Sequence, residues 1–283
     1  MTAIVVSASI STRLAPYWWL ARLTFLKLMA YRWRYLTGIA TYSIFVGGQY
    51  AVWMAVFASR GIPADGTLDG LTLAEMATYL AVGYMARASY FTNTDSEIAE
   101  RFSSGNVALD LLKPLDFHAQ WLAQAAGETA FRLIFFAAPM ALALVPLFGV
   151  AAPAGPGWWQ FPLLFLAAFW INAELNLLAG TIAFFLEDGT GLMSLKRNLI
   201  MLLSGLMVPL HFLPGWLATA TTWLPFAAIG YYPTLAYVGK LGTGALPTFP
   251  QAALAALCWG LALRLANRWL FARARQRLEV QGG

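Results

Sequence analysis

The sequence predicts an all-α, polytopic membrane protein with six transmembrane helices, an N-terminal interfacial helix and external re-entrant helices between spans five and six. Composition is the first reason, because 60% of the 283 residues are hydrophobic and 11% are charged, against roughly 25% charged in soluble domains. The second is the mean hydropathy of +0.63, since a bilayer accepts apolar surface that a soluble fold of this size could not bury. The third is the placement of the 18 Lys and Arg residues.

The same composition excludes several classes of protein. A disordered chain and a nucleic-acid-binding domain are both too polar to match it. A disulfide scaffold is excluded because Cys258 is the single cysteine of the chain. We therefore expect a lipid bilayer around the protein and no nucleic acid as a partner.

The N-terminal region, residues 1–34, is expected to be cytoplasmic and to contain an interfacial helix. Cations and aromatic side chains alternate over residues 13–34, a pattern typical of a helix lying in the membrane surface. The alternative is a simple positively charged flank of the first span. The residues concerned are Arg13, Tyr17, Trp18, Trp19, Arg22, Phe25, Lys27, Tyr31, Arg32, Trp33 and Arg34.

Apolar runs of about 20 residues, the length needed to cross a bilayer as a helix, define the expected spans. They cover residues 35–57, 73–91, 129–150, 158–186, 198–212 and 250–270. Prolines and glycines interrupt residues 213–249 too often for one full span. Because irregular backbone at membrane depth must be shielded by protein, we expect this region to form short external re-entrant helices.

The positive charges predict the orientation of the chain. With these spans, all of the 18 cations except Arg60 and Lys240 lie in cytoplasmic segments or at cytoplasmic ends of spans. The positive-inside rule then places both termini in the cytoplasm. Arg87 and Arg264 are expected to snorkel or to pair with protein groups, and Glu128 and Arg132 to form an i,i+4 pair.

No catalytic motif is present. The chain lacks a G-x-x-x-x-G-K-[ST] phosphate loop, H-E-x-x-H, G-x-S-x-G and C-x-x-C. His118 and His211 are expected at opposite membrane faces, which excludes a shared metal site. We therefore predict that the chain is not an enzyme by itself, binds no cofactor or metal, and would need an ion gradient or a separate ATPase for active transport.

Three polar residues lie in the middle of the fourth span: Asn172, Glu174 and Asn176. A carboxyl group near the bilayer midplane costs several kcal/mol unless it is protonated or paired, so it should face the interior of the bundle. One interpretation is a polar point on a substrate route. The other is an interhelical clasp, in which neutral Glu174 bonds to another span.

The longest polar stretch, residues 92–127, is expected to be a cytoplasmic loop. Residues 95–102 predict a short helix that Gly105 ends, and residues 107–113 predict a second one that Pro114 stops. Two short helices carrying both charges and apolar side chains are suited to docking another protein. The alternative is a solvated loop.

This loop resembles that of the membrane subunits of ABC-2 type exporters. The resemblance rests on Glu97-Ile98, on the run SGNV at 104–107 and on LLKPL at 111–115. It continues with SGLMVPL at 204–210 and LPGWL at 213–217, so that it extends over most of the chain.

The resemblance implies a bacterial inner-membrane permease that exports a substrate. It would work with a separate ATPase subunit, which would bind the ATP and Mg, and with a second permease copy or a homologous permease. The first and fifth spans would lie near the contact between permeases, and the second and fifth along the route. The loop residues expected at the ATPase are Glu97, Glu100, Arg101, Asp110, Lys113 and Pro114, and Met207 joins the three polar residues of the fourth span as a candidate route residue.

Two alternatives stay open. One is a secondary transporter driven by an ion gradient through Glu174. The other is a membrane scaffold without transport activity. An apolar, aromatic-rich interior favours a hydrophobic or amphipathic cargo.

Overall fold

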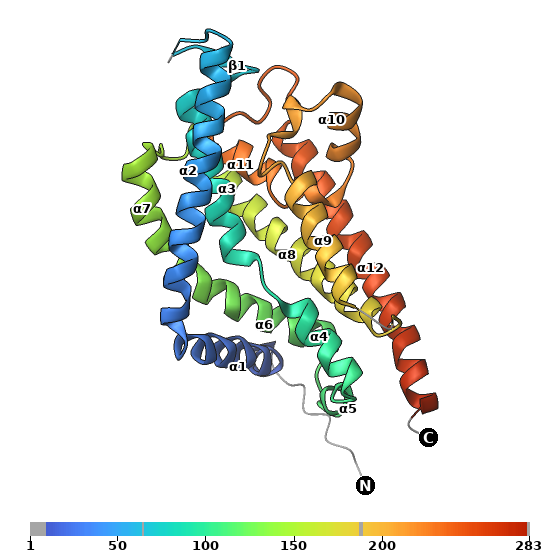
Figure 1. Cartoon of the computed structure of the whole chain (residues 1–283). Coiled ribbons are helices and arrows are strands. Elements are labelled where there is room, and N and C mark those ends of the chain that lie inside the picture. Colours follow the sequence, from blue (N-terminus) through green and yellow to red (C-terminus); the bar gives the residue numbers. More distant parts are fainter. Residues whose placement is uncertain (1–9, 64, 187–188, 282–283) are drawn as a thin grey trace.

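The computed structural model describes residues 10–63, 65–186 and 189–281, and nearly all of its regular structure is helical (Figure 1). Only β1 (Thr67–Leu68) and β2 (Leu71–Thr72) form strands in these ranges, as a small antiparallel hairpin. The predicted all-α class is therefore confirmed. The bundle consists of α2 (Tyr35–Ser59), α3 (Leu73–Tyr90), α7 (Ala138–Phe148), α8 (Gly157–Ala183), α9 (Thr190–Leu203) and α12 (Phe249–Gln281).

Two helices lie across one end of this bundle. The first, α1 (Ile10–Met29), continues through the 3-10 turn η1 (Arg32–Arg34) into α2, and it packs along α6 (Phe117–Arg132) (Figure 1). Their backbones touch at Gly127, where a Cβ atom would lie 2.1 Å from the carbonyl oxygen of Ala21. The N-terminal helix expected from the aromatic and basic pattern is thus present in the described residues, packed on α6.

The third predicted span begins earlier than expected. The helix starts at Phe117 instead of residue 129, because the Asp116 side chain accepts a hydrogen bond of 2.8 Å from the Ala119 amide and caps it. It passes through a π-helical turn, η2 (Leu133–Ala137), into α7. A π-turn is one of the known causes of a helix kink, and here the chain turns from α6, lying across the bundle end, into α7 (Figure 1).

The fifth predicted span also differs. The helix α9 covers residues 190–203 instead of 198–212, and irregular chain follows it to η3 (Leu210–Phe212). At 1.5 Å per residue, the 14 residues of α9 are about 21 Å long, less than the roughly 30 Å hydrocarbon core. In contrast, α3 and α8 lie within a few residues of their predicted bounds.

The interrupted region between α9 and α12 forms short helices, as predicted. They are α10 (Gly215–Thr222), the 3-10 turn η4 (Pro225–Ala228) and α11 (Tyr231–Tyr237). Two buried tyrosines of α3 hold the irregular backbone: the Tyr79 hydroxyl donates to the Gly205 carbonyl at 2.7 Å, and the Tyr90 hydroxyl donates to the Ile229 carbonyl at 2.5 Å. Protein groups therefore provide these backbone carbonyls with hydrogen bonds that lipid tails could not provide.

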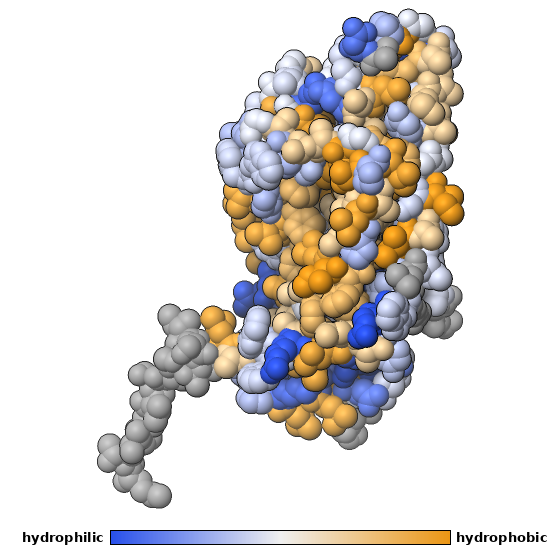
Figure 2. Space-filling model, turned by 90° about the vertical axis from the view of Figure 1, so that its left-hand side faces the viewer, coloured by the Kyte–Doolittle hydropathy of each residue, from blue (hydrophilic) through white to orange (hydrophobic). Residues whose placement is uncertain are grey.

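Four helices of the described residues are long and apolar enough to cross a membrane, by length and composition: Thr37–Ser59, Phe117–Phe148, Gly157–Ala183 and Phe249–Arg277. The face shown in Figure 2 is apolar over its middle and hydrophilic at both ends. These features make the chain a multi-pass membrane protein. The count of six spans stays a prediction, because α3 carries Glu75 and Arg87 and α9 is short.

The first and last helices of the described chain, α1 and α12, reach the same end of the molecule (Figure 1). The short helices α4 (Thr94–Ser103) and α5 (Val107–Leu111) lie at this end too. The β-hairpin and α10 lie at the other end. This arrangement brings the predicted docking loop to the same side as the N-terminal helix.

Candidate functional site

The helices α4 and α5 form the core of the polar loop between α3 and α6. Their bounds, 94–103 and 107–111, match the two predicted helical runs, with Gly105 between them and Pro114 after the second. We call residues 94–114 the α4–α5 segment. It places all six residues that the sequence singled out for docking on one continuous stretch of structure.

Asp110 organises the charges of this segment. Its carboxylate lies 2.9 Å from the Arg101 guanidinium of α4 and 2.7 Å from the Lys113 ammonium. The aspartate side chain is 6% exposed, while those of the arginine and lysine are 41% and 46% exposed. Asp110 is therefore buried beneath two cations and ties the second helical turn to the first.

The outer face of the segment is open to solvent. Glu97 and Glu100 are exposed and line, with Lys27 of α1, a recess of about 340 Å³. Leu109 and Leu112 are 60% and 79% exposed at this polar end of the molecule. Exposed leucines bordered by charges are typical of a protein contact surface, and Pro114 is exposed next to them.

The inner face of the segment is apolar and packs on the bundle. Ile98, Phe102 and Val107 are buried in one cluster with Phe117 and Trp121 of α6. Leu177 of α8 and Ala274 of α12 complete this cluster. The segment is thus a fixed part of the bundle end and is not a solvated loop over these residues.

Close packing joins α4 to α8 at one glycine. A Cβ atom at Gly180 would lie 2.7 Å from the Ile98 Cβ and 2.8 Å from the Asp95 carbonyl oxygen. Real Cβ atoms essentially never come so close, so any larger residue at this position would displace α4. The two helices are therefore in such close contact that α4 cannot move toward α8 without displacing it.

A buried ion pair joins α4 to α9. The Lys196 ammonium donates to the Asp95 carboxylate at 2.6 Å, and both side chains are less than 10% exposed. The same ammonium donates to the side-chain oxygen of Asn176 on α8. The side-chain nitrogen of Asn176 donates in turn to the Thr92 hydroxyl at 3.0 Å. We call Asp95, Lys196 and Asn176 the buried anchor. It ties the start of the α4–α5 segment to two helices of the bundle.

Glu174 belongs to a second polar group and lies two residues before Asn176 on α8. The Asn267 amide of α12 donates to its carboxylate at 2.6 Å, and the Trp170 indole nitrogen donates to it at 3.2 Å. The Arg264 guanidinium of α12 lies 3.7 Å from it. These are the interhelical contacts that the clasp interpretation requires, and they satisfy a carboxyl group that is 3% exposed.

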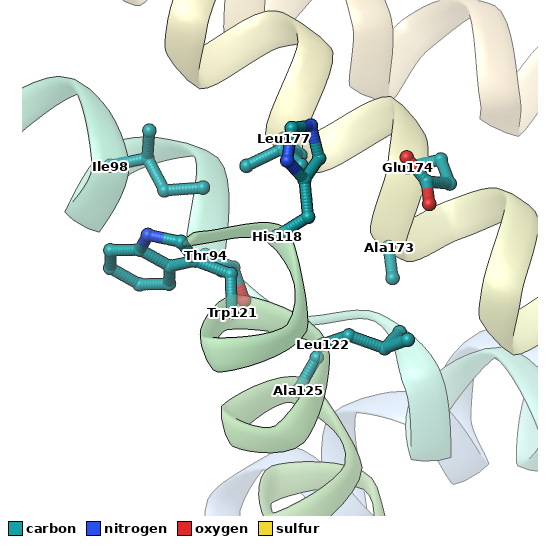
Figure 3. A pocket seen from close by; sticks show the side chains of 9 residues that line it. All are labelled: Thr94, Ile98, His118, Trp121, Leu122, Ala125, Ala173, Glu174 and Leu177. Carbon is teal, nitrogen blue, oxygen red and sulfur yellow. The ribbon is translucent and has the colours of Figure 1, made fainter. Parts of the chain in front are cut away.

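A small void lies beside Glu174. Figure 3 shows side chains from α4, α6 and α8 around it, including Thr94, His118 and Glu174. Its volume of about 10 Å³ is close to the minimum that holds one water molecule. It is far smaller than the several hundred Å³ of typical ligand pockets, so it offers no room for a cargo molecule.

The remaining polar residues of the fourth span separate by partner. The Asn172 amide donates to the Tyr90 carbonyl of α3 at 2.8 Å, whereas Asn176 joins the buried anchor. Met207 lies in the irregular chain after α9 and is partly exposed. The four candidate route residues are therefore not gathered around one cavity.

Sequence reasoning overlooked two of the residues that matter here. Lys196 was expected on the cytoplasmic surface as a topological charge, yet it is buried in the anchor. Asn267 lies between Arg264 and Arg268, so hydropathy does not single it out, although a carboxamide in a predicted span can form an interhelical hydrogen bond. The Glu128–Arg132 pair is confirmed, with 2.8 Å between charged atoms, and Arg264 contacts protein as expected.

Comparison with known proteins gives a family. A profile of the family described as ABC-2 family transporter protein matches residues 44–282. A search of the curated proteins finds no match. The match covers the α4–α5 segment, the buried anchor and all of the bundle except the first residues of α2, and the resemblance noted in the sequence agrees with it. The chain belongs to the ABC-2 transporter family, as a membrane permease of an ABC transporter.

Proposed function

We propose that the chain exports a hydrophobic or amphipathic substrate from the cytoplasm, using ATP hydrolysed by a separate ATPase subunit. The observation that carries the proposal is the α4–α5 segment, which presents exposed charges and leucines outward while the buried anchor ties its first turn to α8 and α9. If an ATPase displaced the segment, the contacts of the buried anchor would transmit the movement to α8 and α9.

The ATPase would contact Glu97, Glu100 and the two exposed leucines. Arg101 and Lys113 would contribute charge at the edge of this surface, with Asp110 fixing their positions and Pro114 ending the second helix. ATP and Mg would be bound by the partner subunit, and this chain would bind no cofactor. Its own contribution would be to convert movement of α4 into a change of bundle packing.

In this proposal the protein lies in a bacterial inner membrane with both termini in the cytoplasm. The support is that α1, the α4–α5 segment and the end of α12 lie at one end of the molecule (Figure 1). That end also carries most of the positive charge. Two permeases, either two copies of this chain or this chain with a homologous permease, would enclose the route.

Reconstitution tests the energy source. In proteoliposomes that contain the permease and its cognate ATPase, we expect uptake of fluorescent amphipathic dyes into inside-out vesicles to require ATP and to survive an uncoupler. Uptake that is independent of ATP and abolished by the uncoupler would contradict the proposal. It would instead support the alternative, an ion-gradient-driven secondary transporter using Glu174.

A further inference from the structure

A recess of about 190 Å³ opens between α2, α3 and α9. Three of its six lining residues are aromatic, and they come from α2 and α3. Its lining consists of Thr41, Tyr42, Phe45, Tyr84, Arg87 and Met201. None of these residues belongs to the α4–α5 segment or to the buried anchor, so the recess is a separate feature of the bundle.

Arg87 is a buried cation that has no acidic partner among the residues that the structure describes. It is 8% exposed, its Nε has no hydrogen-bond partner, and among the described residues no carboxylate lies within 4.0 Å of its guanidinium. Its charge lies 4.4 Å from the Phe91 ring and near the C-terminal end of α3. Both contacts favour a cation, but each compensates only part of the cost of removing one from water.

Tyr84 adds a second unsatisfied donor to the same recess. Its hydroxyl is buried and has no partner among the described residues. The ring is held edge-on by Tyr42 and Phe45, at centroid distances of 6.3 Å and 5.2 Å. Tyr84 and Arg87 are three residues apart on α3, which places both on one helix face. Two residues that line one recess therefore each carry a buried donor atom without a hydrogen-bond partner among the described residues.

Other cations packed into the bundle end are different. Lys196 meets Asp95, Arg132 meets Glu128, and Arg264 lies near Glu174. Each therefore has its counter-charge inside the protein. Among the described residues Arg87 has no such counter-charge, which leaves its guanidinium open to an anionic group of another molecule.

We propose that this recess binds the anionic group of an amphipathic molecule. A carboxylate, sulfonate or phosphate oxygen accepts hydrogen bonds from the Arg87 guanidinium and the Tyr84 hydroxyl, and the apolar part of the molecule packs on Phe45 and Met201. One part of the inference rests on the proposed function: if the chain is an exporter, its cargo is an amphipathic anion.

Matched pyrene probes test the charge preference. Pyrenebutyrate, pyrenebutanol and pyrenebutylamine share one apolar body and differ in the head group. Binding to the full-length permease in phosphatidylcholine nanodiscs is measured by energy transfer from tryptophan, without the ATPase. We expect pyrenebutyrate to bind about tenfold more tightly than the other two, the ratio of one charge-assisted hydrogen bond.

Variants locate the preference. Arg87→Gln should abolish it, Tyr84→Phe should reduce it, and Arg87→Lys should retain part of it because the charge remains. Arg60→Gln, which removes an exposed arginine at the far end of α2, is the matched control and should leave it unchanged. Size-exclusion elution and thermal stability of each variant show that the comparison is made on folded protein.

Further outcomes separate the sources of the anion. If phosphatidylglycerol in the nanodiscs displaces pyrenebutyrate from the wild type but has no such effect in Arg87→Gln, the natural ligand is the head group of an anionic lipid. The proposal that the recess binds an anionic group is then supported. Equal affinity for the three probes, or an unchanged preference in Arg87→Gln, overturns the proposal. So does dissociation of a permease pair by Arg87→Gln without any probe preference, since Arg87 then meets a second copy. If the anion site is overturned in one of these ways but dye uptake still requires ATP, the proposed export function is not contradicted.

Discussion

Lys196 of α9 and Asp95 of α4 form a buried ion pair of 2.6 Å across 101 residues of sequence. Removing one partner of such a pair leaves an unpaired buried charge and costs about 3–5 kcal/mol, whereas replacing both is often close to neutral. We therefore expect Lys196→Met to lower the thermal stability of the purified permease strongly, and the double variant Asp95→Asn with Lys196→Met to recover much of it. Arg197→Met, at the exposed neighbouring position, is the control. A double variant as unstable as the single one would show that the pair itself is not the cause.

Gly180 tests whether α4 and α8 move together. Its replacement by Ala introduces a Cβ 2.7 Å from Ile98, and overpacking of this kind costs roughly 1–3 kcal/mol. We expect Gly180→Ala to uncouple ATP hydrolysis from transport while the complex still assembles. Gly191→Ala in α9 adds the same methyl group where nothing lies within 4 Å and should behave as wild type. Transport per ATP hydrolysed, measured in proteoliposomes, decides between the two results.

Glu100 tests the docking face. Reversal of its charge should weaken ATPase binding about tenfold or more, because like charges brought together at an interface cost several kcal/mol. Asp65→Arg makes the same change at the opposite end of the molecule and should have no effect. Co-purification of the two subunits at several salt concentrations measures the difference. Unchanged co-purification of Glu100→Arg would exclude this face as the contact.

Glu174 separates a structural role from a role in proton transport. Glu174→Gln keeps the shape and can still accept the hydrogen bond from Asn267, so we expect a loss of less than about 1 kcal/mol and normal ATP-driven transport. Glu174→Ala leaves the Trp170 indole nitrogen without its partner and the Asn267 amide with only the backbone carbonyl at position 174, and it should lower stability by about 1–3 kcal/mol. If Glu174→Gln were stable but inactive, titration of the carboxyl group would be required, and the secondary-transport alternative would gain support.

Local signals predicted the helix starts and stops well where they were taken into account. The second span was located by its apolar run, and the structure adds a capping box at its start, in which the Glu75 amide donates to the Thr72 hydroxyl and the Thr72 amide donates to the Glu75 carboxylate. Gly105 and Pro114 divide the α4–α5 segment as expected. The Asp116 cap of α6 was present in the sequence too, but hydropathy located the third span from its apolar part alone.

The candidate site was predicted less completely, for a physical reason. From the sequence, Lys196 is predicted to be an exposed cytoplasmic charge, because Arg197 is next to it and the predicted fifth span begins directly afterwards. Its burial depends on Asp95 and Asn176, which come from two other helices. A pairing of residues so distant in sequence leaves no periodic pattern that one chain can reveal.

The sequence by itself determined the solvent of this protein, its helical class, the polar loop between α3 and α6, and its resemblance to the family that it belongs to. These follow from hydropathy, charge placement and local breaks, which act over a few residues. Only the tertiary structure decided which charges are paired. It turned the polar loop into an anchored segment through Lys196 and joined Glu174 to α12 through Asn267. It also placed Arg87 in one recess with Tyr84, with no acid as its partner among the described residues. Burial converts a surface charge into a constraint, and burial depends on how the helices pack.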